Sequence, residues 1–131
     1  MQALKLSSKK RTEFIDITDE LQAAVTKQEI KSGILFLYVP HTTAGLTVNE
    51  NADPDVKRDM MVKMAEIVPE NSGYKHAEGN SDSHIKSSLF GNELFVFIED
   101  GIIKKGTWQG IYFTEFDGPR NREVWFKISK D

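Results

Sequence analysis

The sequence contains no cysteine, and its 131 residues include only three histidines and two tryptophans. The absence of cysteine excludes thiolate zinc sites and cysteine nucleophiles, which leaves histidine and carboxylate as the strong metal ligands. A chain of this length, with 39% hydrophobic residues, can bury a core without disulfide bonds. We therefore expect a single domain that spans residues 1–131.

Long apolar segments are also absent. No run approaches the length that crosses a bilayer, and residues 1–14 lack the apolar core of a secretory signal. We therefore expect a cytoplasmic protein without a membrane partner. No charge of one sign dominates, since 17 basic and 20 acidic side chains give a formal net charge of −3. Without a basic stripe interleaved with aromatic residues, nucleic acid is not an expected partner, and an anionic ligand must be attracted locally.

The hydrophobic pattern predicts an α+β domain with at least six strands and two or three helices, whose main body resembles a β-sandwich. The polar residues Ser7 to Arg11 are interpreted as a hairpin turn between the first two strands. The run 34–39 is almost wholly apolar, which is typical of a strand buried on both faces. The predicted strands lie around residues 4–6, 14–17, 34–39, 46–49, 95–97, 111–113 and 124–128.

Capping residues and helical spacing predict three helices. The pair Asp53 and Pro54 is a strong start signal, because the carboxylate can cap the helix and proline suits its first position. The apolar residues that follow recur at helical spacing, so we expect this helix to pack on the sheet. We expect the first helix to start at Thr18 and end at Gly33. The second should start at Asp53 and end at Ile67, and the third should start at Ser81 and end at Gly91.

All three histidines lie in short segments rich in other reactive groups. His41 follows Pro40 at the end of a predicted strand, and His76 and His84 enclose a polar segment with two carboxylates. Three neutral imidazoles that converge on one point can hold a divalent transition metal, and zinc suits such a set. The sequence therefore predicts a zinc site at His41, His76 and His84. A set of hydrogen-bonded turn and loop histidines is the alternative interpretation.

Nearby polar residues are candidates for catalysis and for substrate binding. Glu78 and Asp82 could act as a general base or orient the histidine rings. Glu115 shares a face with apolar residues, and a charge there requires a cation or a subunit boundary. We predict these three as catalytic residues. The predicted substrate-binding residues are Asn49, Glu50, Asp53, Lys86 and Arg120, of which Asp53 is also explained by helix capping.

Three segments, HTTAGLTVNENADPDV, HAEGNSDSHIKSSL and GTWQGIYFTEFDGPR, together resemble the YjbQ-like family from about Leu35 to the C-terminus. The resemblance implies a β-sandwich-like α+β fold that assembles as a homotrimer. It also implies a metal-associated polar pocket that contains the motif histidines, and a weak, secondary thiamine-phosphate synthase activity. The candidate catalytic and substrate-binding residues given above match the polar motif positions of the family.

Three hypotheses for function follow. The first is a metal-associated enzyme that acts on a phosphorylated or otherwise anionic small molecule, with weak thiamine-phosphate synthase activity. The second is a metal-dependent hydrolase, because a histidine-bound zinc ion lowers the pKa of its bound water. The third is a non-catalytic trimer that binds a metal or a ligand.

Overall fold

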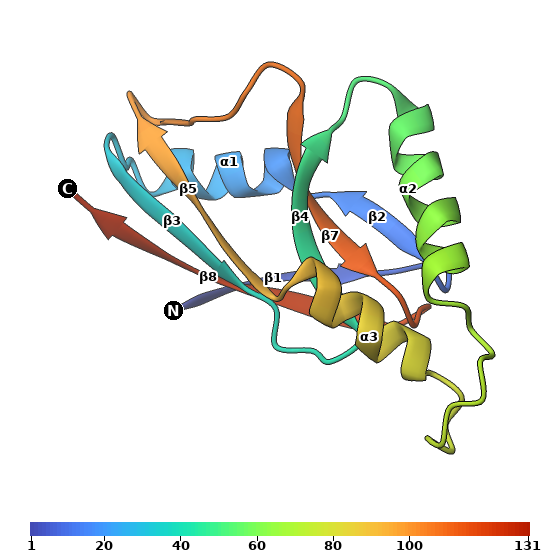
Figure 1. The fold of residues 1–131 in the computed structure, drawn as a ribbon. Coiled ribbons are helices and arrows are strands. Elements are labelled where there is room, and N and C mark those ends of the chain that lie inside the picture. Colours follow the sequence, from blue (N-terminus) through green and yellow to red (C-terminus); the bar gives the residue numbers. More distant parts are fainter.

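The computed structural model describes residues 1–131 and contains two antiparallel sheets and three helices (Figure 1). The predicted α+β class is confirmed. The strands are β1 (Gln2–Ser7), β2 (Glu13–Asp16), β3 (Gly33–Tyr38), β4 (Ala44–Glu50), β5 (Glu93–Glu99), β6 (Ile102–Ile103), β7 (Gln109–Glu115) and β8 (Asn121–Lys130). The helices are α1 (Thr18–Lys27), α2 (Pro54–Ile67) and α3 (Ser81–Phe90). None of them combines the length and the hydropathy that crossing a membrane requires.

The main core lies between a five-stranded sheet, in the order β1-β8-β3-β5-β6, and a three-stranded sheet, in the order β2-β7-β4. Leu35, Phe113 and Val124 are fully buried there, and α1 adds Leu21 and Val25. A smaller cluster lies on the other face of the three-stranded sheet, towards α2 and α3. Because β7 has a core on each of its faces, all of its residues after Gln109 are buried.

The predicted hairpin between the first two strands is wrong. Leu4 of β1 pairs with Val124 of β8, whereas Ile15 of β2 pairs with Phe113 of β7. The polar segment between β1 and β2 therefore crosses from one sheet to the other. Its Ser8 is buried and donates its backbone N–H to the carbonyl oxygen of Arg120.

The first helix differs from its prediction at both ends. Thr18 is its first residue and not its cap, because the Asp16 carboxylate accepts hydrogen bonds from the Thr18 amide at 2.9 Å and its hydroxyl at 2.6 Å. Burial raises the pKa of Asp16, but the hydrogen bonds from Thr18 and Asn51 and the charge of Lys105 outweigh it and hold the pKa below its ordinary value. The helix ends at Lys27, well before Gly33.

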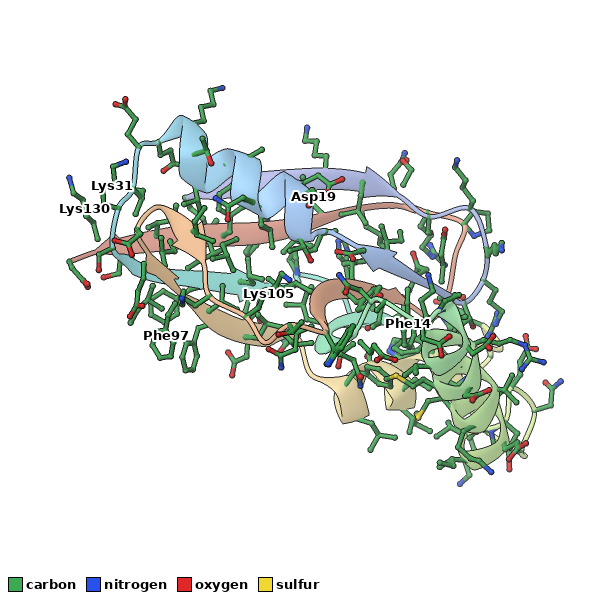
Figure 2. The ribbon with its side chains drawn as sticks, turned by 90° about the horizontal axis from the view of Figure 1, so that it is seen from above. Phe14, Asp19, Lys31, Phe97, Lys105 and Lys130 are labelled. Atoms are coloured by element: carbon green, nitrogen blue, oxygen red, sulfur yellow. The ribbon has the colours of Figure 1, made fainter.

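The start of α2 is confirmed, since Asp53 Oδ1 accepts a hydrogen bond from the Asp55 amide at 2.9 Å and Pro54 is the first helical residue. Its packing is looser than predicted. No residue of α2 is fully buried, and Ile67 is 62% exposed. Met60 and Met61 make its contact with the smaller core cluster around Phe14, which Figure 2 shows near α2.

The third helix is fixed firmly to β4. Gly91 ends α3 with a φ of 92°, a conformation that favours glycine, and its carbonyl oxygen accepts the Leu46 amide at 2.9 Å. A Cβ on Gly45 would lie 2.5 Å from the same oxygen, so only glycine permits this approach. The predicted cap Ser81 is the first helical residue, and Asn80 precedes it as the cap. These contacts hold the beginning of β4 against α3.

Candidate functional site

All three histidines line one cavity of about 410 Å³, called the histidine pocket below. It lies where the β3–β4 loop, the start of α3 and the turn between β7 and β8 meet. No hydrophobic side chain other than a proline ring lines it. The lining residues are Pro40, His41, Thr42, Thr43, His76, Glu78, Asn80, His84, Asp117, Arg120 and Arg122. The three histidines therefore lie around one cavity.

Local structure explains how the histidines meet. β3 ends at Tyr38, and His41 lies in the short loop before β4. His84 lies in the first turn of α3, where its amide bonds to the Asn80 carbonyl oxygen. His76 comes from the loop that precedes α3, and its ring lies edge-to-face with that of His84 at a centroid distance of 5.6 Å. The rings of His76 and His84 therefore form a close pair.

His41 is held differently from this pair. Its Nε2 accepts a hydrogen bond from the backbone N–H of Glu123 at 3.0 Å. A neutral imidazole that accepts at Nε2 carries its proton on Nδ1, so neither ring nitrogen has a free lone pair to bind a metal. Consistently, no group of three histidine or carboxylate side chains is arranged to hold a metal ion.

The electrostatic environment keeps His41 neutral. Burial lowers its pKa below the ordinary value of 6.5, and the positive charge of Arg122 lowers it further. No residue of the chain accepts a hydrogen bond from Nδ1. His41 therefore lines the pocket as a fixed, uncharged N–H donor.

Arg122 is a buried cation whose partner is Glu115. The Nε atom of Arg122 donates to Glu115 Oε1 at 2.9 Å, Nη2 donates to Glu115 Oε2, and Ser8 donates its hydroxyl to Oε1 at 2.6 Å. Burial raises the pKa of Glu115, but the hydrogen bonds from Arg122 and Ser8 outweigh it and hold the pKa below its ordinary value. Glu115 does not line the pocket. The ion pair with Arg122 explains why the charged residue Glu115 shares a face with apolar residues of the same strand.

A second arginine lines the pocket rim. Arg120 donates from Nη2 to Asp117 Oδ2 at 3.0 Å and from Nε to the Asp117 carbonyl oxygen at 2.8 Å. Asn80, which is 6% exposed, donates from Nδ2 to Asp117 Oδ2 at 2.9 Å and to Glu78 Oε2 at 3.3 Å. Asn80 thus orients both pocket carboxylates. Glu78 is exposed and has no cationic partner.

The other predicted residues lie outside the pocket lining. Asp82 is 1% exposed and forms a buried ion pair with Lys86 at 2.9 Å, and Arg11 also donates to it at 2.9 Å. Asn49 and Glu50 lie at the end of β4 opposite to the pocket. Asp53 caps α2. The structure therefore brings only Glu78 and Arg120 of the predicted catalytic and substrate-binding residues to the histidines.

Arg122 and Asp117 are pocket residues that were absent from the sequence-based site. Arg122 alternates with Val124 and Phe126 on the buried face of β8. A charged residue on a buried face needs a partner, so this alternation in the sequence could have identified Arg122 as a candidate site residue. Asp117 had no comparable signal, because its role depends on the turn that brings it to Asn80.

The chain belongs to the YjbQ-like family. The family model for UPF0047 proteins of the YjbQ type matches residues 2–131. The match therefore includes β1, β2 and α1, which precede the segments that carried the resemblance.

Relatives at high identity span nearly the whole chain. The UPF0047 protein YugU of Bacillus subtilis is 49% identical over 98% of both chains, and the UPF0047 protein YjbQ of Escherichia coli O157:H7 is 44% identical over 86% of this chain and 83% of its own. A crystal structure of a YjbQ/UPF0047 family protein from Clostridium acetobutylicum has a TM-score of 0.95 and 50% identity, covering 98% of this chain and all of that one. The fold is therefore that of the family.

Proposed function

We propose that the histidine pocket is the active site of an enzyme that acts on a small anionic molecule, with a phosphorylated substrate as the best match. The observation that carries this proposal is the set of free N–H donors in a cavity lined, apart from one proline, by polar side chains. His41 offers Nδ1–H, and Arg120 and Arg122 each have an Nη1 that makes no hydrogen bond within the chain. Arginine and imidazole N–H groups are suited to phosphate oxygens.

The donors differ in their rigidity. Arg122 is held by Glu115 and by the Thr43 hydroxyl at 2.7 Å, and His41 by the Glu123 amide. Arg120 lies at the exposed rim and can adjust to a ligand. Two preorganised donors and one adaptable donor would orient an anion without large rearrangement.

A divalent metal, with zinc as the best candidate, fits His76 and His84. Their ring centroids are 5.6 Å apart, and no ring nitrogen of either histidine makes a hydrogen bond to the protein, so this pair would supply two of the ligands. His41 does not fit as a third ligand while its Nε2 accepts from Glu123. A bound zinc ion would supply Lewis acidity and an activated water.

Among the predicted catalytic carboxylates, Glu78 is best placed as the general base. It lines the pocket and is not neutralised by an arginine or lysine, unlike Asp82 and Glu115. In a hydrolysis it would take a proton from the attacking water, and return it to the alcohol oxygen when the phosphate ester bond breaks. In the thiamine-phosphate synthase reaction, the same N–H donors would stabilise the departing pyrophosphate.

A calorimetric titration with inorganic phosphate tests the anion site. Arg120→Met should weaken phosphate binding, whereas Arg58→Met, which removes an exposed arginine on α2, should not. Equal affinities in the two variants would contradict the proposal.

Turnover separates an enzyme from a binding protein. Across a panel of phosphate monoesters, Glu78→Gln should abolish hydrolysis and retain phosphate binding, and Glu66→Gln on α2 serves as the control. If Glu78→Gln leaves every activity unchanged while binding persists, the non-catalytic hypothesis replaces this one. Activity that requires an acceptor other than water would favour the synthase.

We also propose a homotrimer that is formed through the outer face of the five-stranded sheet. Phe36, Phe95 and Phe97 are about half exposed there, beside the stacked pair Tyr38 and Trp125. Figure 2 shows Phe97 on the side of this sheet that faces away from α1. Contiguous exposed aromatic side chains mark interaction surfaces, and in a cyclic trimer each copy would bury this face against a different surface of its neighbour.

A further inference from the structure

A second cavity of about 460 Å³ adjoins the histidine pocket and shares His41, Thr42 and His84 with it. We call it the serine pocket, because Ser87 and Ser88 of α3 line it. Its remaining lining residues are Ala44, Gly91 and Asn92. The two cavities therefore lie side by side, with His41, Thr42 and His84 lining both.

The lining chemistry of the two cavities differs. The histidine pocket contains two arginines and two carboxylates, whereas the serine pocket contains no arginine, lysine, aspartate or glutamate. The Thr42 hydroxyl and the Asn92 amide make no side-chain hydrogen bond within the chain, so both retain donor and acceptor capacity. Groups that donate and accept without charge are complementary to hydroxyl groups.

The serine pocket is preformed by the packing of α3 on β4. Ser87 donates its hydroxyl to the Thr42 carbonyl oxygen at 2.7 Å, and Ser88 donates to the His84 carbonyl oxygen at 3.0 Å. The close approach of Gly45 to Gly91 closes the same junction. The hydroxyl groups of Ser87 and Ser88 are thus positioned before any ligand arrives.

We propose that the serine pocket binds the uncharged, hydroxyl-bearing part of the same molecule whose anionic group lies in the histidine pocket. The substrate class is then a phosphorylated polyol or sugar. This inference rests on the proposed anion site. An aromatic ligand fits less well, since Ala44 is the one hydrophobic residue of the lining.

Calorimetric titrations with inorganic phosphate, glycerol 3-phosphate and ribose 5-phosphate test the inference. We expect both esters to bind more tightly than phosphate. Asn92→Ala should reduce that advantage by roughly three- to tenfold, as expected for one lost hydrogen bond, without changing the affinity for phosphate. Ser88→Leu, which fills the cavity with an apolar side chain, should act in the same direction. Asn71→Ala, at an exposed site outside both pockets, is the matched control.

The outcomes separate the two proposals. If phosphate binds but neither ester binds more tightly, or if Asn92→Ala and Ser88→Leu both preserve the advantage, the serine pocket is not a subsite and the anion site stands. If neither phosphate nor the esters bind, the anion site is wrong, and this inference is overturned with it.

Discussion

The Nε2 atom of His41 accepts a hydrogen bond from the backbone amide of Glu123, 3.0 Å away, just beyond the end of the pairing between β3 and β8. The pairing of these strands ends with Tyr38 opposite Trp125. Beyond that pair, the His41 side chain replaces the missing strand as the acceptor for β8. The pocket histidine is therefore also part of the sheet, and this fixes its tautomer.

His41→Ala should lower the free energy of unfolding by about 1 kcal/mol, because the Glu123 amide loses its acceptor in a partly buried position. His76→Ala should change it by much less, since the residue is exposed and its ring nitrogens make no hydrogen bond within the chain. Urea denaturation of both variants measures the difference. Equal stabilities would show that the bond to Glu123 contributes nothing.

Arg122→Met should be strongly destabilising, by about 3–5 kcal/mol, because it leaves the fully buried Glu115 carboxylate without its cation. The double variant Glu115→Leu with Arg122→Met should recover part of this loss, since no charge then remains buried. Guanidinium unfolding gives both values. A double variant as unstable as the sum of its single substitutions would contradict the pairing.

Glu115 should also make stability depend on pH. The pKa of Glu115 in the folded protein is below the ordinary value of 4.5. The ionised carboxylate therefore contributes its full stabilisation above pH 4.5, and this stabilisation is lost as the pH falls through the pKa of the folded state. Glu115→Gln should therefore flatten the decline of the unfolding free energy between about pH 5 and pH 2. Asp59→Asn, at an exposed position of α2, should leave the decline intact. Parallel curves for Glu115→Gln and the wild-type protein would rule out this role.

Local signals in the sequence were sufficient for much of the fold. Asp53 and Pro54 identified the start of α2, and Gly91 identified the end of α3, because each acts on its immediate neighbours. The pairing of β1 with β8 joins opposite ends of the chain, and no local pattern encodes such a contact. The polar turn after β1 was therefore interpreted as a hairpin.

The difference between local signals and contacts between distant residues also applies to the site. The histidines were identified because they are rare and lie in polar segments, and the fold brings all three to one pocket. Spacing in the sequence does not indicate which ring nitrogens already make hydrogen bonds. Only the structure shows that Nε2 of His41 is bonded to the Glu123 amide, which distinguishes His41 from the other two histidines. The location of Glu50 at the far end of β4 likewise depends on the direction of the strand.

Phe95→Lys should shift the proposed trimer to monomer, because it places a charge in the aromatic face of the five-stranded sheet. Leu89→Lys is a matched control, since Leu89 is an exposed hydrophobic residue on α3, away from that face. Sedimentation velocity distinguishes the assemblies. A wild-type protein that sediments as a monomer would contradict the trimer. If only Leu89→Lys causes dissociation, the interface lies on α3 and not on the aromatic face.

The metal content of the purified, tag-free protein, followed by zinc titration, decides whether the histidine pocket is a metal site. We expect zinc uptake that is lost in His76→Ala and in His84→Ala but retained in His41→Ala, because only the first two histidines have ring nitrogens free to bind the ion. Loss in all three variants would show that His41 gives up its bond to Glu123 to become a third ligand. No bound metal and no uptake on titration would contradict the proposed metal-dependent enzyme.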